Sequence, residues 1–315
     1  MRKKIDKAIM FSGRKTQYLA EKIAENYGKP LGRIEVKEFA DKEFRTAFVD
    51  NVRGKDVFLI QSTFAPADNL MELLMMADAA KRASARRIVA VIPYYGYARQ
   101  DRKDKPRVPI TAKLTAKLLV TAGIKRLITM DLHADQIQGF FDIPVDHLYA
   151  SSIFLPYLKK MDLKNLIFAS PDTGGTRRAA AYAKKMNTDF VICYKQRSVA
   201  NKIEKMKLIG NVKGKDVVLL DDIVDTAGSI TKAANLMLEN GANSVRAFIT
   251  HPVLSNDAVE KIKHSAFDDF FVTDTIPLSQ EAVECNKLKV LSAAPLFAEV
   301  IKRVMTAQSI TTLFE

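Results

Sequence analysis

Long hydrophobic runs are absent from this 315-residue sequence, and no apolar stretch reaches the roughly 18 residues that a membrane-spanning helix needs. Residues 1–7 are basic, but no long apolar segment follows them, so we expect no cleaved signal peptide. Cysteine is scarce, because Cys193 and Cys285 are the only two, and a secreted disulfide scaffold carries more. These absences predict a cytosolic protein that does not act at a membrane.

Two common nucleotide-binding signatures are also missing. The sequence has no G-x-x-x-x-G-K-[ST] phosphate loop; residues 210–216 come near it, but the spacing is short and Asp216 replaces Ser or Thr. It has no G-x-G-x-x-G dinucleotide fingerprint. It also lacks a basic tail, zinc-finger spacing and a repeated basic–aromatic pattern, so nothing beyond overall charge points to nucleic acid.

Positive charge is abundant. Lys and Arg number 49 against 36 Asp and Glu, which gives a net charge of +13. A basic excess indicates an anionic partner, either nucleic acid or a phosphorylated small molecule, unless it is only a solvated basic surface. With 48% hydrophobic and 27% charged residues the composition is that of a folded globular protein, and the length predicts two domains.

Short apolar runs alternate with Ala- and Leu-rich helical segments. We expect helices at 69–85, 110–122 and 229–240, with Gly123 and Gly241 where left-handed C-caps belong. This alternation predicts the α/β class, with mostly parallel sheets flanked by helices. The expected buried strands are residues 57–60, 88–92, 126–130, 166–169, 217–220 and 245–249.

The two halves of the chain resemble each other. The string Gly54-Lys-Asp-Val-Phe-Leu-Ile60 recurs 160 residues later as Gly214-Lys-Asp-Val-Val-Leu-Leu220. We infer two copies of one α/β unit, although so short a repeat can also arise by chance. The predicted domains are residues 1–148 and 149–315.

The stretch after the second copy of the repeat carries the clearest chemistry. Asp221 and Asp222 follow an expected strand where the first copy has Gln61-Ser62, and a turn with Thr, Gly and Ser then leads into a helix. In open α/β sheets ligands bind at the carboxyl ends of strands, and backbone N–H groups at a helix N-terminus suit a phosphate monoester. The two carboxylates would take sugar hydroxyls, directly or through a metal. The alternative is an ordinary capped turn with solvated acids.

This stretch resembles the phosphoribosyl-pyrophosphate (PRPP) motif shared by type I phosphoribosyltransferases and PRPP synthetases. Other strings, spread from about residue 5 to Phe314, resemble class I of the PRPP synthetase family, the ribose-phosphate pyrophosphokinases. The resemblance implies two domains of the type I phosphoribosyltransferase-like fold. It also implies a reaction in which ATP and ribose 5-phosphate give PRPP and AMP with Mg²⁺. The strings are residues 39–43, 61–62, 81–85, 92–101, 130–134, 136–142 and 170–175.

The resemblance assigns ATP to the first domain and ribose 5-phosphate to the second. Lys42 stands where the family usually has Gly, and a positive φ there would not favour Lys. Residues 39–43 would reach the site from a neighbouring subunit. The implied ATP contacts are Phe39, Asp41, Lys42, Glu43, Arg99, Gln100 and His133. The implied ribose 5-phosphate contacts are Asp221, Asp222, Asp225, Thr226, Ala227, Gly228 and Ser229.

A magnesium site is expected from Asp131, His133 and Asp172. Asp131-Leu-His133 ends an expected strand, and residues two apart on a strand share a face, so both side chains can reach one ion. Mg²⁺ prefers oxygen ligands and keeps waters, which Asp142 and Asp146 could hold unless they are structural. The resemblance gives Asp172 a metal or ribose contact, although an Asp before two glycines also forms turns.

Lys195 and Arg197 match the paired cations of the family's catalytic flexible loop. Pyrophosphoryl transfer builds charge on the β-phosphoryl oxygens, and cations held there lower the barrier. A loop that closes can also exclude water, which competes as an acceptor. Many relatives carry a loop richer in Arg and Pro, whereas this chain has Gln196, Ser198 and Val199.

Class I members of the family are usually hexamers that phosphate activates and ADP inhibits at subunit interfaces. The resemblance therefore implies a homo-oligomer with these effectors. The tail near residues 303–315 resembles a family segment that packs back on the first domain. Segments resembling the effector site contain Arg53, Arg82, Arg102, Ser309 and Thr311, each equally well explained as an ordinary surface or interface residue.

Three other functions remain open at this point. A PRPP-consuming phosphoribosyltransferase would explain residues 217–230 but not Arg99-Gln100 or residues 131–133. A catalytically silent regulatory relative would be expected to lose Lys195 or the residues around Asp221, and all are present. A nucleic-acid-binding protein would show binding that weakens steeply with salt.

Overall fold

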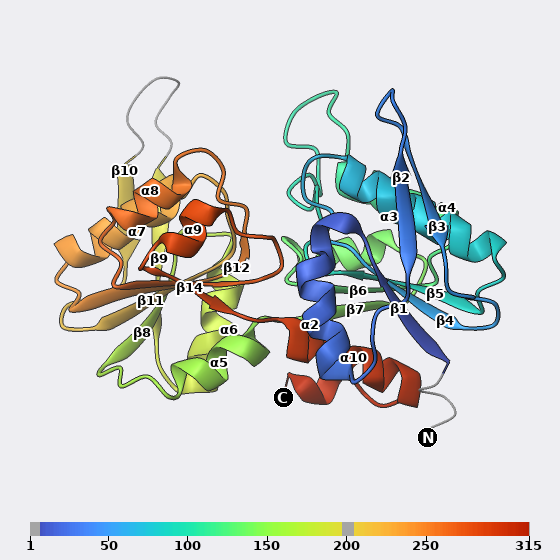
Figure 1. The fold of residues 1–315 in the computed structure, drawn as a ribbon. Coiled ribbons are helices and arrows are strands. Elements are labelled where there is room, and N and C mark those ends of the chain that lie inside the picture. Colours follow the sequence, from blue (N-terminus) through green and yellow to red (C-terminus); the bar gives the residue numbers. More distant parts are fainter. Residues whose placement is uncertain (1–6, 197–204, 315) are drawn as a thin grey trace. The chain divides into compact units, whose positions relative to one another are not determined.

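The computed structural model describes residues 7–196 and 205–314, and the chain divides into two compact units (Figure 1). Unit 1 comprises Met1–Ala150, Thr275–Pro277 and Ala293–Glu315. Unit 2 comprises Ser151–Asp274 and Leu278–Ser292. The expected second domain was residues 149–315, with the tail near 303–315 packing back on the first domain; in the structure Ala293–Glu315 belongs to unit 1.

Unit 1 is built on a five-stranded parallel sheet in the order β1-β4-β5-β6-β7. Its central strands are almost wholly buried, and strands covered on both faces read as continuous apolar runs. That is why three of them could be predicted from the sequence. The strands are β1 (Ala8–Ser12), β4 (Asp56–Ile60), β5 (Arg87–Ile92), β6 (Arg126–Met130) and β7 (Val145–Leu148).

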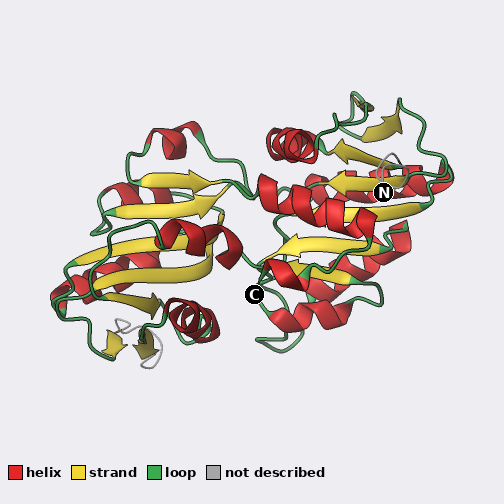
Figure 2. Cartoon of the chain, turned by 90° about the horizontal axis from the view of Figure 1, so that it is seen from below, coloured by secondary structure: helices red, strands yellow, loops and turns green. Residues whose placement is uncertain are grey.

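Helices lie on both sides of this sheet (Figure 2). The inner faces of α3 and α4 share one apolar cluster with alternate strand residues such as Leu59 and Ala90. Helix α10, from the C-terminal segment, packs against α2. The α-helices of unit 1 are α2 (Gln17–Tyr27), α3 (Asp68–Arg82), α4 (Thr111–Ala122) and α10 (Ala294–Thr306), and the short 3₁₀ helices are η1 (Arg14–Thr16), η2 (Asp135–Phe140) and η3 (Thr311–Leu313).

A separate antiparallel hairpin, β2 (Ile34–Glu38) with β3 (Phe44–Phe48), completes unit 1. Its residues alternate between half-buried and exposed positions, so it lacks the continuous apolar run of the main sheet. The sequence analysis did not predict this hairpin, which carries residues 39–43 in its turn.

Unit 2 is built on a seven-stranded sheet in the order β10-β9-β8-β11-β12-β13-β14, in which only β10 runs antiparallel to its neighbour. Helices again cover both faces: α7 and α8 share one cluster with Leu219 and Ala247, while aromatic residues of α5 pack on Phe248 from the other face. The strands are β8 (Leu166–Ser170), β9 (Phe190–Gln196), β10 (Lys205–Ile209), β11 (Asp216–Val224), β12 (Ser244–Pro252), β13 (Asp269–Thr273) and β14 (Leu288–Leu291). The helices are α5 (Ser151–Leu158), α6 (Thr176–Met186), α7 (Gly228–Glu239), α8 (Ala258–Lys263) and α9 (Gln280–Glu284).

The inferred repeat is confirmed by the matching order of the parallel strands, β1-β4-β5-β6-β7 and β8-β11-β12-β13-β14. The glycines that open the repeated string adopt the same left-handed conformation, with φ of 68° at Gly54 and 69° at Gly214. Each donates its N–H to the segment after the matching helix, to Ser84 at 2.9 Å and to Gly241 at 2.8 Å. A side chain would strain this conformation, which accounts for Gly in both copies.

No helix in residues 7–196 and 205–314 combines the length and the apolar character needed to cross a membrane.

Candidate active site

Strand β11 carries the acidic pair that the sequence analysis placed after a strand. The structure corrects this detail, because β11 continues to Val224 and Asp221 lies inside it, paired with Ile249 of β12. The neighbouring strand β8 stops pairing at Leu219. Asp221 and Asp222 therefore lie where β11 extends past β8. At these residues β11 pairs with β12 on one edge but no longer with β8 on the other.

Arg178 of α6 fills that space. Its Nη1 lies 3.3 Å from Asp221 Oδ1 and 3.2 Å from Asp222 Oδ1, so one guanidinium serves two carboxylates. Burial raises the pKa of Asp221 well above its usual range, and the Asp222 carboxylate adds to the rise. The Arg178 guanidinium lowers the pKa of Asp221, whereas the Asp172 carboxylate, like that of Asp222, raises it. Arg178 thus offsets only part of the rise in the pKa of Asp221.

Asp172 lies in the turn between β8 and α6. Its Oδ1 accepts hydrogen bonds from the amides of Gly174 at 2.8 Å and Gly175 at 3.2 Å, as expected of an Asp that forms a turn. Gly175 is needed for space, since a Cβ there would lie 2.6 Å from Ser170 Oγ. One carboxylate oxygen, Oδ1, thus shapes the turn.

The turn after β11 leads directly into the start of α7. Ala227 adopts a left-handed conformation, with φ of 58°, and among the described residues no side chain caps the helix. The first amides of a helix have no partner inside it, so they point toward whatever lies at the N-terminus. Thr226 and Ser229 are exposed at the same end, and Gly228 and Asp225 are half-buried beside them.

Arg99 and Gln100 are exposed in the long connection between β5 and α4. Gln100 Oε1 accepts a hydrogen bond from Thr111 Oγ1 at 2.5 Å, which ties the connection to the start of α4. Tyr95, by contrast, is buried and donates to the carbonyl of Ala112 at 2.9 Å. This tyrosine is a core residue.

The structure does not support the strand argument for Asp131 and His133. Strand β6 ends at Met130, and Asp131 turns away from it with φ of 37°. Asp131 is buried and its Oδ2 accepts the amide of Ala150 at 3.2 Å, whereas His133 is exposed. The shared role of these two residues at a metal stays a prediction. Asp146 pairs with Arg126 at 2.6 Å and is structural.

The turn of the β2–β3 hairpin holds Phe39, Asp41, Lys42 and Glu43, all exposed. Lys42 has φ of 75°, the positive value that favours the glycine usual in the family. Its Nζ bonds Glu38 Oε1 at 2.9 Å, and that contact lowers the pKa of Glu38.

Lys195 lies on β9, opposite Met206 of β10. Arg197 lies outside the described residues. The five expected effector residues all belong to unit 1. Arg53 and Arg82 are exposed, and Gly54 bonds Ser84, so the turn that holds Arg53 lies beside the segment just after α3. Arg102 and Thr311 are exposed, and the Ser309 carbonyl accepts from Arg303 at 2.6 Å.

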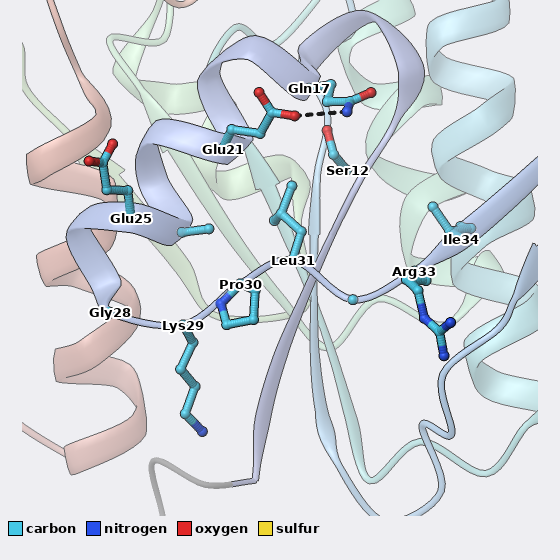
Figure 3. Close-up of a pocket in the computed structure, with 12 residues that line it drawn as sticks. Ser12, Gln17, Glu21, Glu25, Gly28, Lys29, Pro30, Leu31, Arg33 and Ile34 are labelled. Carbon is cyan, nitrogen blue, oxygen red and sulfur yellow. Dashed lines mark hydrogen bonds between the residues drawn. The ribbon is translucent and has the colours of Figure 1, made fainter.

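A hollow of about 680 Å³ runs along α2 and residues 28–34 of unit 1 (Figure 3). Its lining residues, from Ser12 to Ile34, include none of the predicted site residues that the structure describes. In the described part of the chain, no three His, Cys, Asp or Glu side chains are grouped as a ready metal site. Mg²⁺ needs only one or two carboxylates and keeps its waters, so this finding does not conflict with a weak magnesium site.

The sequence analysis missed Arg178 and His147. The sequence contains one indication that Arg178 has an anionic partner. Helix α6 begins with two arginines, at the end where the helix dipole disfavours cations. The acidic pair of β11 explains Arg178. His147, buried on β7, left no signal, since its contact with the Leu132 amide depends on how β6 and β7 pair.

Comparison with known proteins identifies the family. Residues 8–123 match the family model described as the N-terminal domain of ribose phosphate pyrophosphokinase, and residues 195–315 match a phosphoribosyl synthetase-associated domain. The chain is 59% identical over 306 residues to a ribose-phosphate pyrophosphokinase of Porphyromonas gingivalis, covering 97% of each chain. It is 54% identical over 306 residues to that of Wolinella succinogenes, covering 97% of this chain and 98% of the other.

A solved structure agrees with these relatives. The crystal structure of phosphoribosylpyrophosphate synthetase from Mycobacterium smegmatis matches with a TM-score of 0.90 and 39% identity, covering 95% of this chain and 99% of the other. Fold, sequence and length therefore agree, and the chain belongs to the ribose-phosphate pyrophosphokinase family of enzymes.

Proposed function

We propose that this chain transfers the β,γ-pyrophosphoryl group of ATP to the C1 hydroxyl of ribose 5-phosphate in a Mg²⁺-dependent reaction. The C1 oxygen forms a bond to the β-phosphorus, and the bond from that phosphorus to the oxygen bridging it to the α-phosphorus breaks. AMP leaves with the bridging oxygen, the hydroxyl proton passes to solvent, and the other product is PRPP. The observation that carries the proposal is the combination of the acidic pair on β11 with the open start of α7.

The ribose 5-phosphate site is assigned to unit 2. The 5-phosphate would be bound by the amides at the start of α7 and by the hydroxyls of Thr226 and Ser229, because a helix N-terminus attracts an anion. Asp225, Ala227 and Gly228 shape this turn. Asp221 and Asp222 would accept hydrogen bonds from the ribose hydroxyls.

Magnesium fits the charge of this cluster. Asp221 and Asp222 share the guanidinium of Arg178, and the pKa of Asp221 is raised first by burial, then by Asp222 and least by Asp172. Asp172 would contribute a carboxylate oxygen to the ion, and in unit 1 His133 and Asp131 are assigned to the ATP-bound ion. Mg²⁺ would neutralise phosphate charge when bound.

ATP is assigned to unit 1. Arg99 is exposed and its planar guanidinium suits phosphate oxygens, while the Gln100 side chain fixes the connection that presents it. The hairpin turn that holds Phe39, Asp41, Lys42 and Glu43 would contact the nucleotide. In the transferring step Lys195 and Arg197 would stabilise charge on the β-phosphoryl oxygens.

The assembly and the effectors are also proposals. We assign a homohexamer, activation by phosphate and inhibition by ADP, with Arg53, Arg82, Arg102, Ser309 and Thr311 as the effector residues. The location of all five in unit 1 is compatible with one shared site.

The test is a coupled assay for AMP release from ATP, with Mg²⁺, ribose 5-phosphate and inorganic phosphate. The wild type is compared with Lys195→Ala and with Lys207→Ala, an exposed lysine of β10 that serves as the matched control. We expect AMP formation that requires ribose 5-phosphate, collapses in Lys195→Ala and persists in Lys207→Ala.

No AMP from a folded wild type over a range of phosphate concentrations would refute the synthetase assignment. PRPP consumption with an added nucleobase would then indicate a phosphoribosyltransferase. Equal loss in both lysine variants would refute the specific role of Lys195 while leaving the reaction intact.

A further inference from the structure

The segment after β6 leaves the strand with a positive φ. Asp131 has φ of 37°, in the left-handed region that most residues avoid and that Asp and Asn adopt more readily than others. Local contacts support such a conformation. Here it stands two residues before His133, which the proposed function assigns to ATP.

The residues of β7 and its continuation enforce this conformation. The amide of Asp131 donates to the carbonyl of Leu148 at 2.9 Å, and the amide of Ala150 donates to Asp131 Oδ2 at 3.2 Å. The third bond is of a different kind: the amide of Leu132 donates to Nε2 of His147 at 2.9 Å. Strands β6 and β7 are neighbours in the sheet, and this pairing brings the two segments together (Figure 1).

The imidazole of His147 is buried beside Leu132. It is only 8% exposed, and Leu132 is 3% exposed, so their hydrogen bond is shielded from water. Nε2 accepts from the Leu132 amide, and Nδ1 lies 3.3 Å from Gln138 Nε2 and 3.6 Å from Asp135 Oδ1, so both ring nitrogens have polar neighbours. The ring of Tyr149 lies 4.5 Å from the imidazole.

The C-terminal tail packs against the Tyr149 ring. Phe314 packs edge-on against Tyr149 with centroids 5.5 Å apart. The tail itself is fastened by Arg303, whose Nη1 donates to the Ser309 carbonyl and to Thr312 Oγ1, each at 2.6 Å. The contacts therefore run without a break from the tail to the Leu132 amide, all within unit 1.

We propose that His147 is a positioning residue of the nucleotide site. It fixes the peptide between Asp131 and His133 through the Leu132 amide, and Tyr149 and Phe314 keep its ring in place. This inference rests on the proposed role of His133 in ATP binding. A loosened segment would present His133 poorly, so the KM for Mg·ATP should rise while the KM for ribose 5-phosphate stays unchanged.

The test compares two substitutions. His147→Phe keeps an aromatic ring beside Tyr149 but removes the acceptor, whereas His147→Gln keeps an acceptor near the position of Nε2. His264→Phe, an exposed histidine of unit 2 just after α8, is the matched control. The readouts are both KM values, kcat, and hydrogen–deuterium exchange of a peptide spanning residues 131–134.

For His147→Phe we expect the KM for Mg·ATP to rise about tenfold, the factor for one buried hydrogen bond, with faster exchange of the Leu132 amide. His147→Gln should stay within about threefold of the wild type, a rescue that simple loss of packing would not give. Unchanged exchange in His147→Phe, or an equal rise of both KM values, would overturn the proposal. If the wild type released no AMP, the proposed function would fail, and the exchange data alone would still decide whether His147 holds the segment.

Discussion

Replacing Asp221 with Asn should stabilise the protein while impairing ribose 5-phosphate binding. The Asp221 and Asp222 oxygens lie 3.3 Å and 3.2 Å from the same guanidinium nitrogen, so they are at most 3.3 + 3.2 = 6.5 Å apart. At an effective dielectric constant of about 20 their repulsion is then at least about 2.5 kcal/mol, against about 5 kcal/mol of attraction between Asp221 and Arg178. Arg178 must serve both acids, and burial adds several kcal/mol of desolvation cost per ion.

The direction follows from the pKa of Asp221, which burial and then Asp222 raise well above the ordinary value of 3.8. A carboxyl whose pKa is raised in the folded state gives up folded-state stability as the pH rises from its unfolded-state value toward its folded-state value. The loss is complete above the folded-state value and absent below pH 3.8. Near pH 8 the Asn variant should therefore gain about 1–2 kcal/mol, or about 1.5–3 °C in Tm for a chain of this length.

The measurement is thermal unfolding followed by circular dichroism at pH 8, 6 and 4.5, since the chain has no tryptophan to report on unfolding. The gain should shrink steadily toward pH 4.5. Asp216→Asn is the control on the same strand, because Asp216 is bound to Ser244 Oγ at 2.6 Å and lies outside the cluster. A lower Tm for Asp221→Asn at pH 8, or a gain independent of pH, would refute the electrostatic account. The KM for ribose 5-phosphate should rise in Asp221→Asn alone.

Two further predictions concern the hairpin and the repeat, and urea unfolding checks both. Lys42→Gly should be more stable than Lys42→Ala by about 1 kcal/mol, because only Ala keeps a Cβ at φ of 75° while both variants lose the contact with Glu38; the opposite order would contradict the strain. Asp56→Ala should cost about 2 kcal/mol, since it removes the buried carboxylate that accepts hydrogen bonds from both Arg86 and Arg87, and Asp216→Ala, at the same repeat position, about 1 kcal/mol. Similar losses at the two positions would show that the arginine contacts of Asp56 add nothing.

The sequence predicted those parts of the fold that depend on local pattern. Continuous apolar runs gave the central strands because both faces of each sheet are covered, and the repeated string gave the duplication. The β2–β3 hairpin was not predicted, because its residues are exposed or half-buried and therefore form no continuous apolar run. The strand argument for Asp131 and His133 failed because β6 ends one residue before Asp131, at Met130. The contacts of Arg178 could not be predicted, since they depend on how α6 packs beside β11.

The duplicated fold also explains why a phosphate monoester is expected at this strand–helix turn in only one copy. In unit 1 the position equivalent to Asp221 is Gln61, whose side chain is fully buried against Gly13, where an added Cβ would lie 2.2 Å from Oε1. The helix that follows, α3, has Asp68 in its first turn, and that charge repels a phosphate from the N-terminus. The matching helix of unit 2, α7, has no acidic residue in its first turn and exposes Ser229 there. The turn between strand and helix is therefore filled and acidic in unit 1, whereas the matching turn of unit 2 can accept an anion.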